Sequence, residues 1–379
     1  MRRSSLTLMC VLAVIAGTAG TARAQGALSL LGFGYPVGGT STRGVGSGGS
    51  LAGLDPQSPM NPAAIVLGTR LQGYFQFEPE FRSVQAGGPA VNTTTTRFPL
   101  FMVSGQQERA TFALSFSSFM DRTWSNSYAD TQSVGTERIP STVFTSSVGG
   151  IADVRAAMAW TFSEQFHVGA AVHLFPGENR VTLGRIFADS SKAGGFQLDN
   201  RYSFTGTAMS FGAVWLTGHH IALGGDVRLG GAIRMRLGDT TLVGSGTIPL
   251  RAGLTASYDG LAGTVFTVRV GKERWTDFRG LGSSALGLKD ATDVSVGMEV
   301  LGPSLGATPM VIRTGYRVRG LPFTYGTTAV REGSFAGGLG IPVGGSRAML
   351  DLGVSRATRT AATITEKAWL MSIGVGIRP

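Results

Sequence analysis

Hydrophobic and charged side chains alternate along the chain between Ile221 and Leu237. Successive side chains of a β-strand point to opposite faces, so the alternation predicts one long strand with an apolar face and a charged face. The apolar positions are Ile221, Leu223, Val227, Leu229, Ile233, Met235 and Leu237, and the charged positions are Asp226, Arg228, Arg234 and Arg236. The segment exceeds the roughly 9–11 residues with which a tilted strand crosses a bilayer. Because the pattern recurs along the rest of the chain, it predicts a membrane barrel rather than a soluble sandwich.

Parity and turn signals, followed along the whole chain, predict fourteen strands. They span 70–82, 96–105, 109–122, 150–162, 165–176, 199–216, 219–237, 245–258, 262–275, 290–301, 308–320, 333–342, 346–360 and 364–377. Short connections alternate with long polar ones. The short ones include Ser163-Glu164, Thr217-Gly218, Asp259-Gly260-Leu261 and Val343-Gly344-Gly345, and the long ones include 123–149, 177–198, 276–289 and 321–332. Short periplasmic turns, longer external loops and an even strand number are typical of outer-membrane barrels. We therefore predict an all-β, transmembrane antiparallel β-barrel over residues 70–379, with a periplasmic N-terminus.

The tryptophans fit this orientation. Trp160 and Trp215 precede predicted periplasmic turns, and Trp275 and Trp124 lie near predicted external ends. Aromatic residues at these heights are expected to form the two interfacial girdles of a membrane barrel, with chance placement as the alternative.

The N-terminus predicts export. Arg2 and Arg3 are followed by the apolar segment 6–16 and by a small-x-small cleavage site at 22–24, which together indicate a secretory signal peptide over residues 1–24. The chain's single cysteine, Cys10, lies inside this segment, so we expect no disulfide and no cysteine-based metal or catalytic site in the exported protein. No later segment offers 18 consecutive apolar residues. An exported chain built from long amphipathic strands points to the bacterial outer membrane.

Composition agrees with a barrel. The chain has 57 glycines and only 15% charged residues, and glycine suits tightly curved strands and turns. The formal charge of +10 raises nucleic acid as a partner. The arginines are spread singly along strand faces rather than clustered, so we expect no nucleic-acid binding.

Residues 25–69 form a different kind of segment ahead of the first strand. Asn61 is a good helix N-cap, Pro62 suits a first helical position and Gly68 can end the turn, so a short helix is expected after a glycine-rich stretch. The segment is either a disordered periplasmic tail or a plug folded inside the lumen. Its apolar content, Leu28, Leu30, Leu31, Phe33 and Tyr35, favours the plug.

The order of signal peptide, glycine-rich stretch, Asn61-Pro62-Ala63 and long first strand resembles the FadL family of outer-membrane transporters, whose N-terminal hatch carries a similar Asn-Pro-Ala. Three C-terminal motifs are similar too: Trp275-Thr276-Asp277-Phe278, Arg313-Thr314-Gly315-Tyr316 and Lys367-Ala368-Trp369-Leu370. The resemblance implies a fourteen-stranded barrel that passes long-chain fatty acids or other hydrophobic molecules across the outer membrane. It also implies a lateral exit at an inward kink of the third strand, beside the hatch.

Some residues depart from that family pattern. The third predicted strand, 109–122, has no Gly or Pro to favour a kink, whereas Pro99 interrupts the second strand instead. The mature chain is shorter than the best-known members, and it ends in Ile377-Arg378-Pro379 rather than in an aromatic residue. These departures concern the substrate and the exit route more than the fold.

Candidate catalytic motifs are better explained by structure. Gly302-Pro303-Ser304-Leu305-Gly306 matches G-x-S-x-G but lies in a predicted hairpin rather than at a strand-to-helix elbow. The glycines at 44, 46 and 49 lack a surrounding βαβ unit. His167 and His173 share a parity without a third ligand at metal-binding spacing, and His219 and His220 fall at a turn. We expect neither an enzyme nor a cofactor.

Arginines oppose the apolar parity of their strands and are expected to face the lumen. They are Arg228, Arg234, Arg236, Arg251, Arg269, Arg313, Arg317 and Arg319, with Asp226, Asp293 and Glu299 on the same faces. One interpretation is an ionic network that packs the lumen and holds the plug. The other is a ladder that steers the carboxylate of a fatty acid.

Three functions remain open at this point. The first is passive uptake of hydrophobic or amphipathic molecules, such as long-chain fatty acids, by a plugged, monomeric barrel in contact with outer-membrane lipid. The second is a binding or scaffold barrel that serves protein secretion or surface assembly. The third, an aqueous porin, is disfavoured by an ordered plug.

Overall fold

The computed structural model describes residues 34–85, 90–191, 193–281, 287–305, 308–344 and 347–378. The expected signal peptide and the first part of the expected plug, including Leu28 and Phe33, lie outside the described residues. Within the described parts, no helix is long and apolar enough to cross a membrane.

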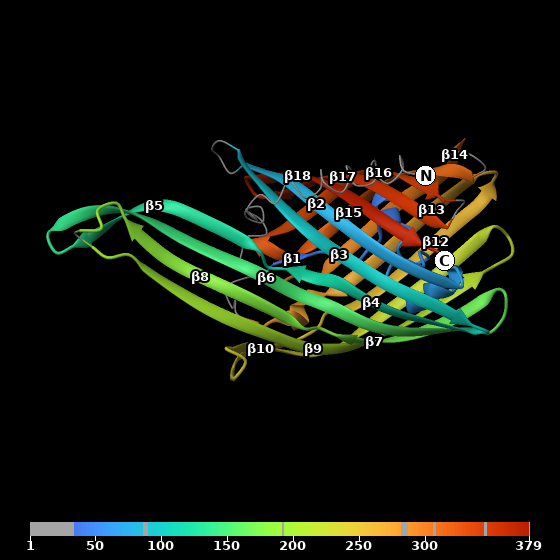
Figure 1. Cartoon of the computed structure of the whole chain (residues 1–379), viewed down its shortest axis with the longest axis horizontal. Helices are drawn as coiled ribbons and strands as arrows, with labels where there is room; N and C mark the ends of the chain where they lie inside the picture. Colours follow the sequence, from blue (N-terminus) through green and yellow to red (C-terminus); the bar gives the residue numbers. More distant parts are fainter. Residues whose placement is uncertain are drawn as a thin grey trace, which may run out of the picture.

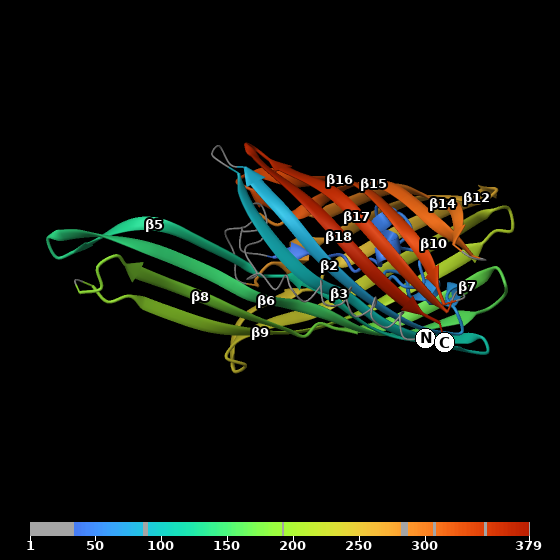
Figure 2. The same ribbon diagram turned by 45° about the horizontal axis from the view of Figure 1, so that its top comes forward.

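Fourteen strands form a closed antiparallel barrel, which β18 completes by pairing with β2 (Figures 1 and 2). They are β2 (Leu71–Gln85), β3 (Val91–Gln107), β4 (Ala110–Asp121), β6 (Glu137–Thr161), β7 (Phe166–Leu174), β9 (Phe196–Leu216), β10 (Ile221–Leu237), β12 (Leu250–Leu261), β13 (Thr264–Arg274), β14 (Ala291–Leu305), β15 (Thr308–Tyr325), β16 (Thr328–Val343), β17 (Ala348–Ala361) and β18 (Ile364–Ile377). Each of the fourteen predicted strands overlaps one of them. The predicted fold class is therefore confirmed.

Three of the predicted long loops are strands, so that part of the prediction is wrong. Segment 123–149 forms β5 (Trp124–Val134) and the first half of β6, and segment 177–198 forms β8 (Gly177–Phe187) and the start of β9. Segment 321–332 lies mostly in β15 and β16, which meet in a tight turn after Tyr325. Segment 123–149 is rich in Ser and Thr, and such polarity resembles that of a loop.

β5, β8 and the outer halves of β6 and β9 form a four-stranded sheet in the order β5-β6-β8-β9. We call this sheet the arm (residues 124–149 and 177–205). Figure 1 shows it projecting from one side of the barrel, at the end opposite β7's first residues. A strand of 25 residues such as β6 spans about 80 Å, so it continues well beyond a bilayer.

Along β9, the outer face changes from apolar to polar at the same height at which the lumen face changes from polar to apolar. Outside the barrel, Met209, Phe211 and Trp215 are 45–55% exposed, as expected for side chains that face lipid. Above Met209 the same face turns polar with Gln197, Asp199, Arg201, Ser203, Thr205 and Thr207. The lumen side changes in the opposite sense, from the buried Ser210 to the apolar Phe204. The upper edge of the lipid-facing band therefore lies near Thr207.

A β-bulge in β10 reverses which side chains face the lumen. The prediction that one parity faces the lumen throughout Ile221–Leu237 is therefore wrong. The register of β10 against β9 shifts between Gly230 and Ile233. Gly230 is required there, because a Cβ would lie 1.6 Å from the Ile248 carbonyl oxygen. Beyond the bulge, Ile233 and Met235 turn into the lumen and are buried. The predicted lumen positions of Arg234 and Arg236 are thus wrong: Arg234 is exposed on the outer side and Arg236 is half-buried.

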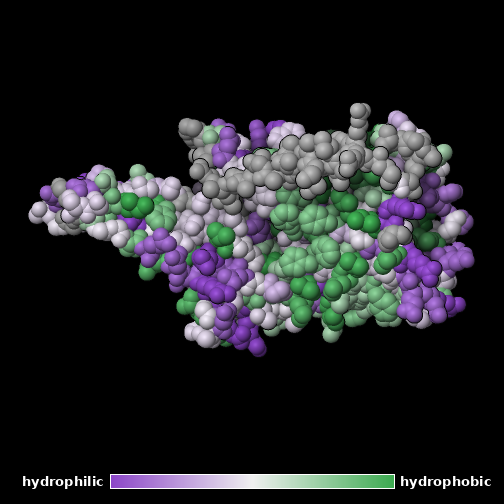
Figure 3. Space-filling view, viewed as in Figure 1, coloured by the Kyte–Doolittle hydropathy of each residue, from purple (hydrophilic) through white to green (hydrophobic). Residues whose placement is uncertain are grey.

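An apolar band surrounds the barrel, and Figure 3 shows it over the strands that face the viewer, with hydrophilic residues at the end away from the arm. Trp160 and Trp215 are exposed on this outer face near the turns that follow β6 and β9. Trp275 is only 1% exposed and belongs to the lumen, so its predicted place in an external girdle is wrong.

Candidate functional site: the hatch and the external mouth

Residues 34–69, which we call the hatch, lie inside the barrel (Figures 1 and 2). They contain β1 (Tyr35–Pro36), α2 (Thr42–Gly46) and the 3₁₀ helix η1 (Pro62–Leu67). Asn61 caps η1: its Oδ1 accepts from the Ala63 amide at 2.9 Å, and its Nδ2 donates to the Gly53 and Ala213 carbonyls at 2.9 and 3.2 Å. Ala63 is fully buried. Asn61-Pro62-Ala63 therefore joins a hatch helix to the wall at β9.

Glycines of the inner wall let the hatch backbone approach closely. A Cβ at Gly212 would lie 1.9 Å from the Asn61 Oδ1, and a Cβ at Gly315 would lie 2.1 Å from the Ser47 carbonyl oxygen. A side chain at either position is sterically incompatible with the seated hatch. Part of the high glycine content thus serves the fit between hatch and wall.

Polar side chains also fix the hatch. Arg43 pairs bidentately with Glu299 at 2.5–2.9 Å, and the Thr42 and Ser372 hydroxyl oxygens are 2.8 Å apart. Asp55 accepts from the Ser41 hydroxyl and from the Gln57 amide. Asp55 is fully buried, and this burial raises the pKa of its carboxyl despite these donors.

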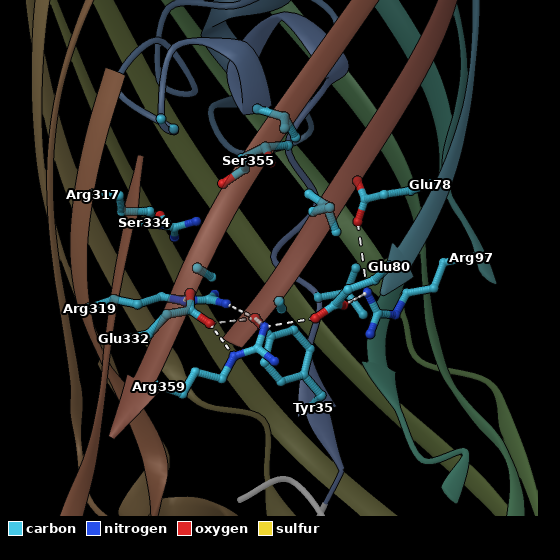
Figure 4. Close-up of a pocket in the computed structure, with 18 residues that line it drawn as sticks. Tyr35, Glu78, Glu80, Arg97, Arg317, Arg319, Glu332, Ser334, Ser355 and Arg359 are labelled. Atoms are coloured by element: carbon cyan, nitrogen blue, oxygen red, sulfur yellow. Dashed lines mark hydrogen bonds and ion pairs between the residues drawn. The ribbon is translucent and has the colours of Figure 1, made fainter. Parts of the chain in front are cut away.

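The ring of Tyr35 lies in a cage of four arginines, three of which, Arg97, Arg319 and Arg359, are drawn in Figure 4. The guanidinium carbons of Arg82, Arg97, Arg319 and Arg359 are 5.3, 5.3, 5.3 and 4.4 Å from the ring centroid. Burial raises the pKa of the Tyr35 hydroxyl, which donates to Glu332 at 2.9 Å and accepts from Arg359 at 2.7 Å. Glu80, Glu332 and Glu366 pair with the cage arginines. This ionic cluster attaches β1 to strands from both ends of the chain.

Most of the predicted arginine ladder is neutralised by the wall itself. Arg313 pairs with Glu299 and Asp351 at 2.6 and 2.5 Å, Arg317 with Asp293 at 2.5 Å, and Arg319 with Glu332 at 2.5 Å. Arg269 and Arg251 share Asp226 at 2.8 and 3.5 Å, and Arg251 also donates to the Met60 carbonyl of the hatch at 2.8 Å. The geometry favours a structural network over a steering ladder for these residues.

The ladder of hydrogen bonds between β3 and β4 ends early. Their pairing runs only from Gln107 with Ala110 to Leu100 with Ser117. Next to this point β3 bulges at Phe98-Pro99, and β4 bulges between Ser118 and Met120 although it has no Gly or Pro. Above it, β1 pairs with Met120 and Asp121, and Arg97 donates to Asp121 at 3.0 Å. The hatch therefore completes the wall where the two strands part.

Apolar side chains fill the external end of the lumen, and we call them the mouth cluster. They are Phe119, Met120, Ile151, Phe175, Phe204, Ala208, Ile233, Met235, Ile248, Trp275, Phe278, Leu281 and Leu288. The Phe119 ring stacks on Trp275 at 5.7 Å and meets Phe175 edge-on at 5.0 Å. Trp275 comes from the 3₁₀ helix η2 (Trp275–Phe278). The connection after β13, expected to be a polar external loop, thus folds back into the barrel.

Arg228 and Arg155 stand apart from the neutralised arginines. In the part of the chain that the structure describes, neither makes an ion pair with a carboxylate. Arg228 donates to the Pro249 carbonyl and lies 5.3 and 5.9 Å from the Phe119 and Phe175 rings, while Arg155 donates to the Pro59 carbonyl of the hatch. Both are at most 3% exposed and keep unpartnered N–H groups. Two buried guanidinium groups without an ion pair therefore lie near the place where the hatch meets the mouth cluster, and Asp153 and Glu273 line the cavity there.

A cavity of about 40 Å³ separates hatch and mouth, lined by Met60, Phe119, Asp153, Arg228, Arg251 and Trp275 among others. Further cavities of about 60 and 70 Å³ lie beside Arg269 and around Tyr35. Such spaces are large enough for a few water molecules but too small for a hydrophobic ligand. The conformation is closed.

Asp153, His173 and Ser210 form a hydrogen-bonded chain on the inner wall. The His173 Nδ1 lies 2.7 Å from an Asp153 oxygen, and its Nε2 lies 2.8 Å from the Ser210 hydroxyl. The order resembles a hydrolase triad, but Ser210 is 1% exposed and out of reach of a substrate here. Among the residues described, no group of three His, Cys, Asp or Glu side chains could hold a metal ion.

The sequence interpretation missed Arg155, the mouth cluster and the Asp153 partner of His173. The sequence indicated only that His173 shares a parity with His167, and its meeting with Asp153 and Arg155 depends on the register of β6 against β7. Trp275-Thr276-Asp277-Phe278 was noticed as a motif, and two of its side chains are the buried ones.

Solved structures provide the comparison with known proteins. A FadL homologue from Pseudomonas aeruginosa superposes with a TM-score of 0.62 at 13% identity, over 91% of this chain and 99% of that one. The fold is that of the FadL homologues. The toluene transporters TbuX of Ralstonia pickettii and TodX of Pseudomonas putida share the FadL fold with a TM-score of 0.57 each, at 14% and 12% identity, over 90% of this chain and 99% and 98% of theirs. No protein-family model and no curated protein sequence matches the chain.

Proposed function

We propose that this chain is an outer-membrane channel for passive uptake of hydrophobic or amphipathic molecules, with long-chain fatty acids as the substrate class. The observation that carries the proposal is the mouth cluster, a set of aromatic and aliphatic side chains inside the lumen directly above the hatch. Small-molecule sites combine an apolar lining with a few polar groups that fix orientation, and Arg228 supplies such a group here. The FadL fold, shared with two toluene transporters, supports the same function class.

The route follows from the closed conformation. A ligand that enters the mouth displaces the aromatic side chains, and it continues only when the hatch moves. The seam between β3 and β4 is the proposed exit, because the hatch strand β1 fills it. Movement of β1 would open the lumen and the wall together.

Arg228 makes the substrate class testable. Replacing Arg228 by Met should weaken binding of palmitate by about 10- to 100-fold, because a charge-assisted hydrogen bond contributes roughly 1.5–3 kcal/mol. Toluene, which has no charge, should bind equally to both proteins. Isothermal titration in a non-lipidic detergent measures both affinities, and Arg201→Met, outside the lumen, is the matched control.

Equal losses for palmitate and toluene would contradict the carboxylate role of Arg228 and leave uptake of neutral compounds. Failure of the folded wild-type protein to bind either compound, and absence of any retained apolar molecule in its mass spectrum, would contradict the channel itself.

A scaffold barrel for secretion or surface assembly is the second candidate. The specific observation in its favour is the exposed edge of β5, an eleven-residue strand without Lys or Pro. Edge strands of this kind are templates for strand addition. Retention of ligand by the purified barrel would favour the channel over the scaffold.

A further inference from the structure

The outer wall of the barrel has an open groove of about 920 Å³ that crosses β9, β10, β12 and β13 and reaches the start of β14. Its floor consists of small residues on the outer face, Ala213, Gly225 and Ala252. Gly225 pairs with Ala213 on one side and with Leu254 on the other. Beside these small residues, the Leu254 side chain is 71% exposed. The groove is therefore a recess in the wall with an apolar side chain rising at its edge.

The sides of the groove belong to the apolar band that faces lipid. Phe211, Val270 and Val294 line it and are 45–52% exposed. Side chains of such a band contact acyl chains in the membrane. The strands of the groove are not those of the seam between β3 and β4, so the groove is separate from the proposed exit.

Lys272 lies at the external end of the groove. It follows Val270 on the outer face of β13 and pairs with Ala252 on β12 and with Thr292 on β14. The strand ends two residues later at Arg274, directly before η2, whose side chains belong to the mouth cluster at the external end of the lumen. Lysine side chains at this height extend toward the headgroups of the lipid. The ammonium group of Lys272 is thus placed at the headgroups of the external leaflet.

The charge of Lys272 is not neutralised by the protein. Nearby, Arg274 pairs with Asp277 at 2.7 Å, and Asp293 pairs with Arg317 at 2.5 Å on the lumen side. Lys272 is exposed and makes no ion pair with a carboxylate in the part of the chain that the structure describes. A free cation at this height complements an anionic headgroup.

We propose that the groove is a binding site for one lipid of the external leaflet, with a phosphate of the lipid at Lys272 and an acyl chain along the floor at Gly225. The occupant that we assign is lipid A, the phosphate-bearing glycolipid of that leaflet, because the cation lies at the external end of the groove. The site is on the outside of the barrel, so this inference goes beyond the proposed channel in the lumen and does not depend on it.

The test uses the full-length protein, freed of lipid by exchange into a non-lipidic detergent, and native mass spectrometry to count bound lipids. The probes are diphosphoryl lipid A, phosphatidylglycerol and phosphatidylethanolamine. The wild-type protein should retain one lipid A molecule and bind it more tightly than either phospholipid. Lys272→Met should weaken the binding of lipid A about fivefold, as expected for one lysine near an anionic headgroup, and leave phosphatidylethanolamine unchanged.

A second variant tests the floor of the groove. Gly225→Val places a branched side chain on the floor, and the wall can accept it because the nearest atom to the new Cβ is a Leu254 methyl group at 3.5 Å. This variant should lose lipid A, since the acyl chain no longer fits. Palmitate binding should be unchanged in both variants, so the outcome for the groove is independent of the outcome for the channel.

Matched controls come from the opposite end of the chain's strand order. Lys367→Met removes an exposed lysine on the outer face of β18, and Gly73→Val adds a side chain on β2 where no atom lies within 4 Å of the Cβ. Both proteins should retain lipid A like the wild type.

Three outcomes would overturn the proposal. Equal weakening by Lys272→Met and Lys367→Met would mean that lipid A responds only to the overall surface charge. Tighter binding of phosphatidylglycerol than of lipid A would contradict the assigned occupant. A protein dimer that is lost in Gly225→Val, without a lipid adduct in the wild type, would assign the groove to a second copy of this chain.

Discussion

Deletion of residues 25–69 should convert a non-conducting barrel into an open pore. The hatch fills the lumen beneath the mouth cluster, and three cavities beside it among the described residues measure about 40, 60 and 70 Å³. Without it, only the side chains of the mouth cluster narrow the lumen of the fourteen-stranded barrel, and the pore opens whenever they move aside. Single-channel recording in planar bilayers should show steps for the deletion variant and none for the wild-type protein. Unchanged conductance would contradict the assignment of residues 25–69 as a plug.

A single substitution, Gly315→Ala, tests the plug independently while the whole hatch stays in the protein. Gly315→Ala places a Cβ 2.1 Å from the Ser47 carbonyl oxygen, so the hatch cannot seat fully. Gly73→Ala is the matched control, because no atom lies within 4 Å of its Cβ. We expect intermittent conductance from the first variant and none from the second. Equal, silent recordings would show that the hatch tolerates displacement without opening.

Replacing Arg359 by Leu should destabilise the barrel by about 3–5 kcal/mol, the cost of leaving buried charges without their partner. Arg359 contacts Glu332, Glu366 and Glu80, with Glu366 fully buried, and it donates to the Tyr35 hydroxyl. Urea unfolding in lipid bilayers, followed by tryptophan emission, measures the free energy of unfolding.

Arg201→Met is the control for that measurement. Arg201 pairs with Glu178 on the arm, where both side chains are about half exposed. Exposed ion pairs contribute roughly 0.2–1 kcal/mol, so this variant should unfold like the wild-type protein. A loss below about 1 kcal/mol for Arg359→Leu would mean that water reaches the Tyr35 cluster and screens it.

The strands that cross the lipid were predictable because lipid imposes one rule on them. Every such strand must present apolar side chains outward at every second residue, and Met209, Phe211 and Trp215 show the result on β9. The arm obeys the opposite rule, with the polar face outward, and parity alone cannot tell where one rule replaces the other. The Gly230-Gly231 pair was the local signal of that change on β10, but it was interpreted as part of a regular strand.

The lumen could be predicted only in part, because contacts across a barrel depend on strand registers. Parity placed Arg313 and Glu299 on inner faces, and their pairing follows from the register of β14 against β15. The partner of Tyr35 on β17 is 324 residues away, and nothing local to either residue indicates the contact. The N-cap role of Asn61 could be predicted because a helix cap depends only on neighbouring residues. Its hydrogen bond to the Ala213 carbonyl could not, because Ala213 is far away in the sequence.

Uptake by the proposed channel requires movement of the hatch, and a reversible disulfide between hatch and wall tests that movement directly. Thr42 and Ser372 can be replaced by cysteines, since their hydroxyl oxygens are 2.8 Å apart and the chain's single cysteine lies in the expected signal peptide. Uptake of palmitate into proteoliposomes is then measured before and after reduction. We expect the oxidised protein to be inactive and a reductant to restore uptake to the wild-type rate. Full uptake by the oxidised protein would show that the hatch does not need to move.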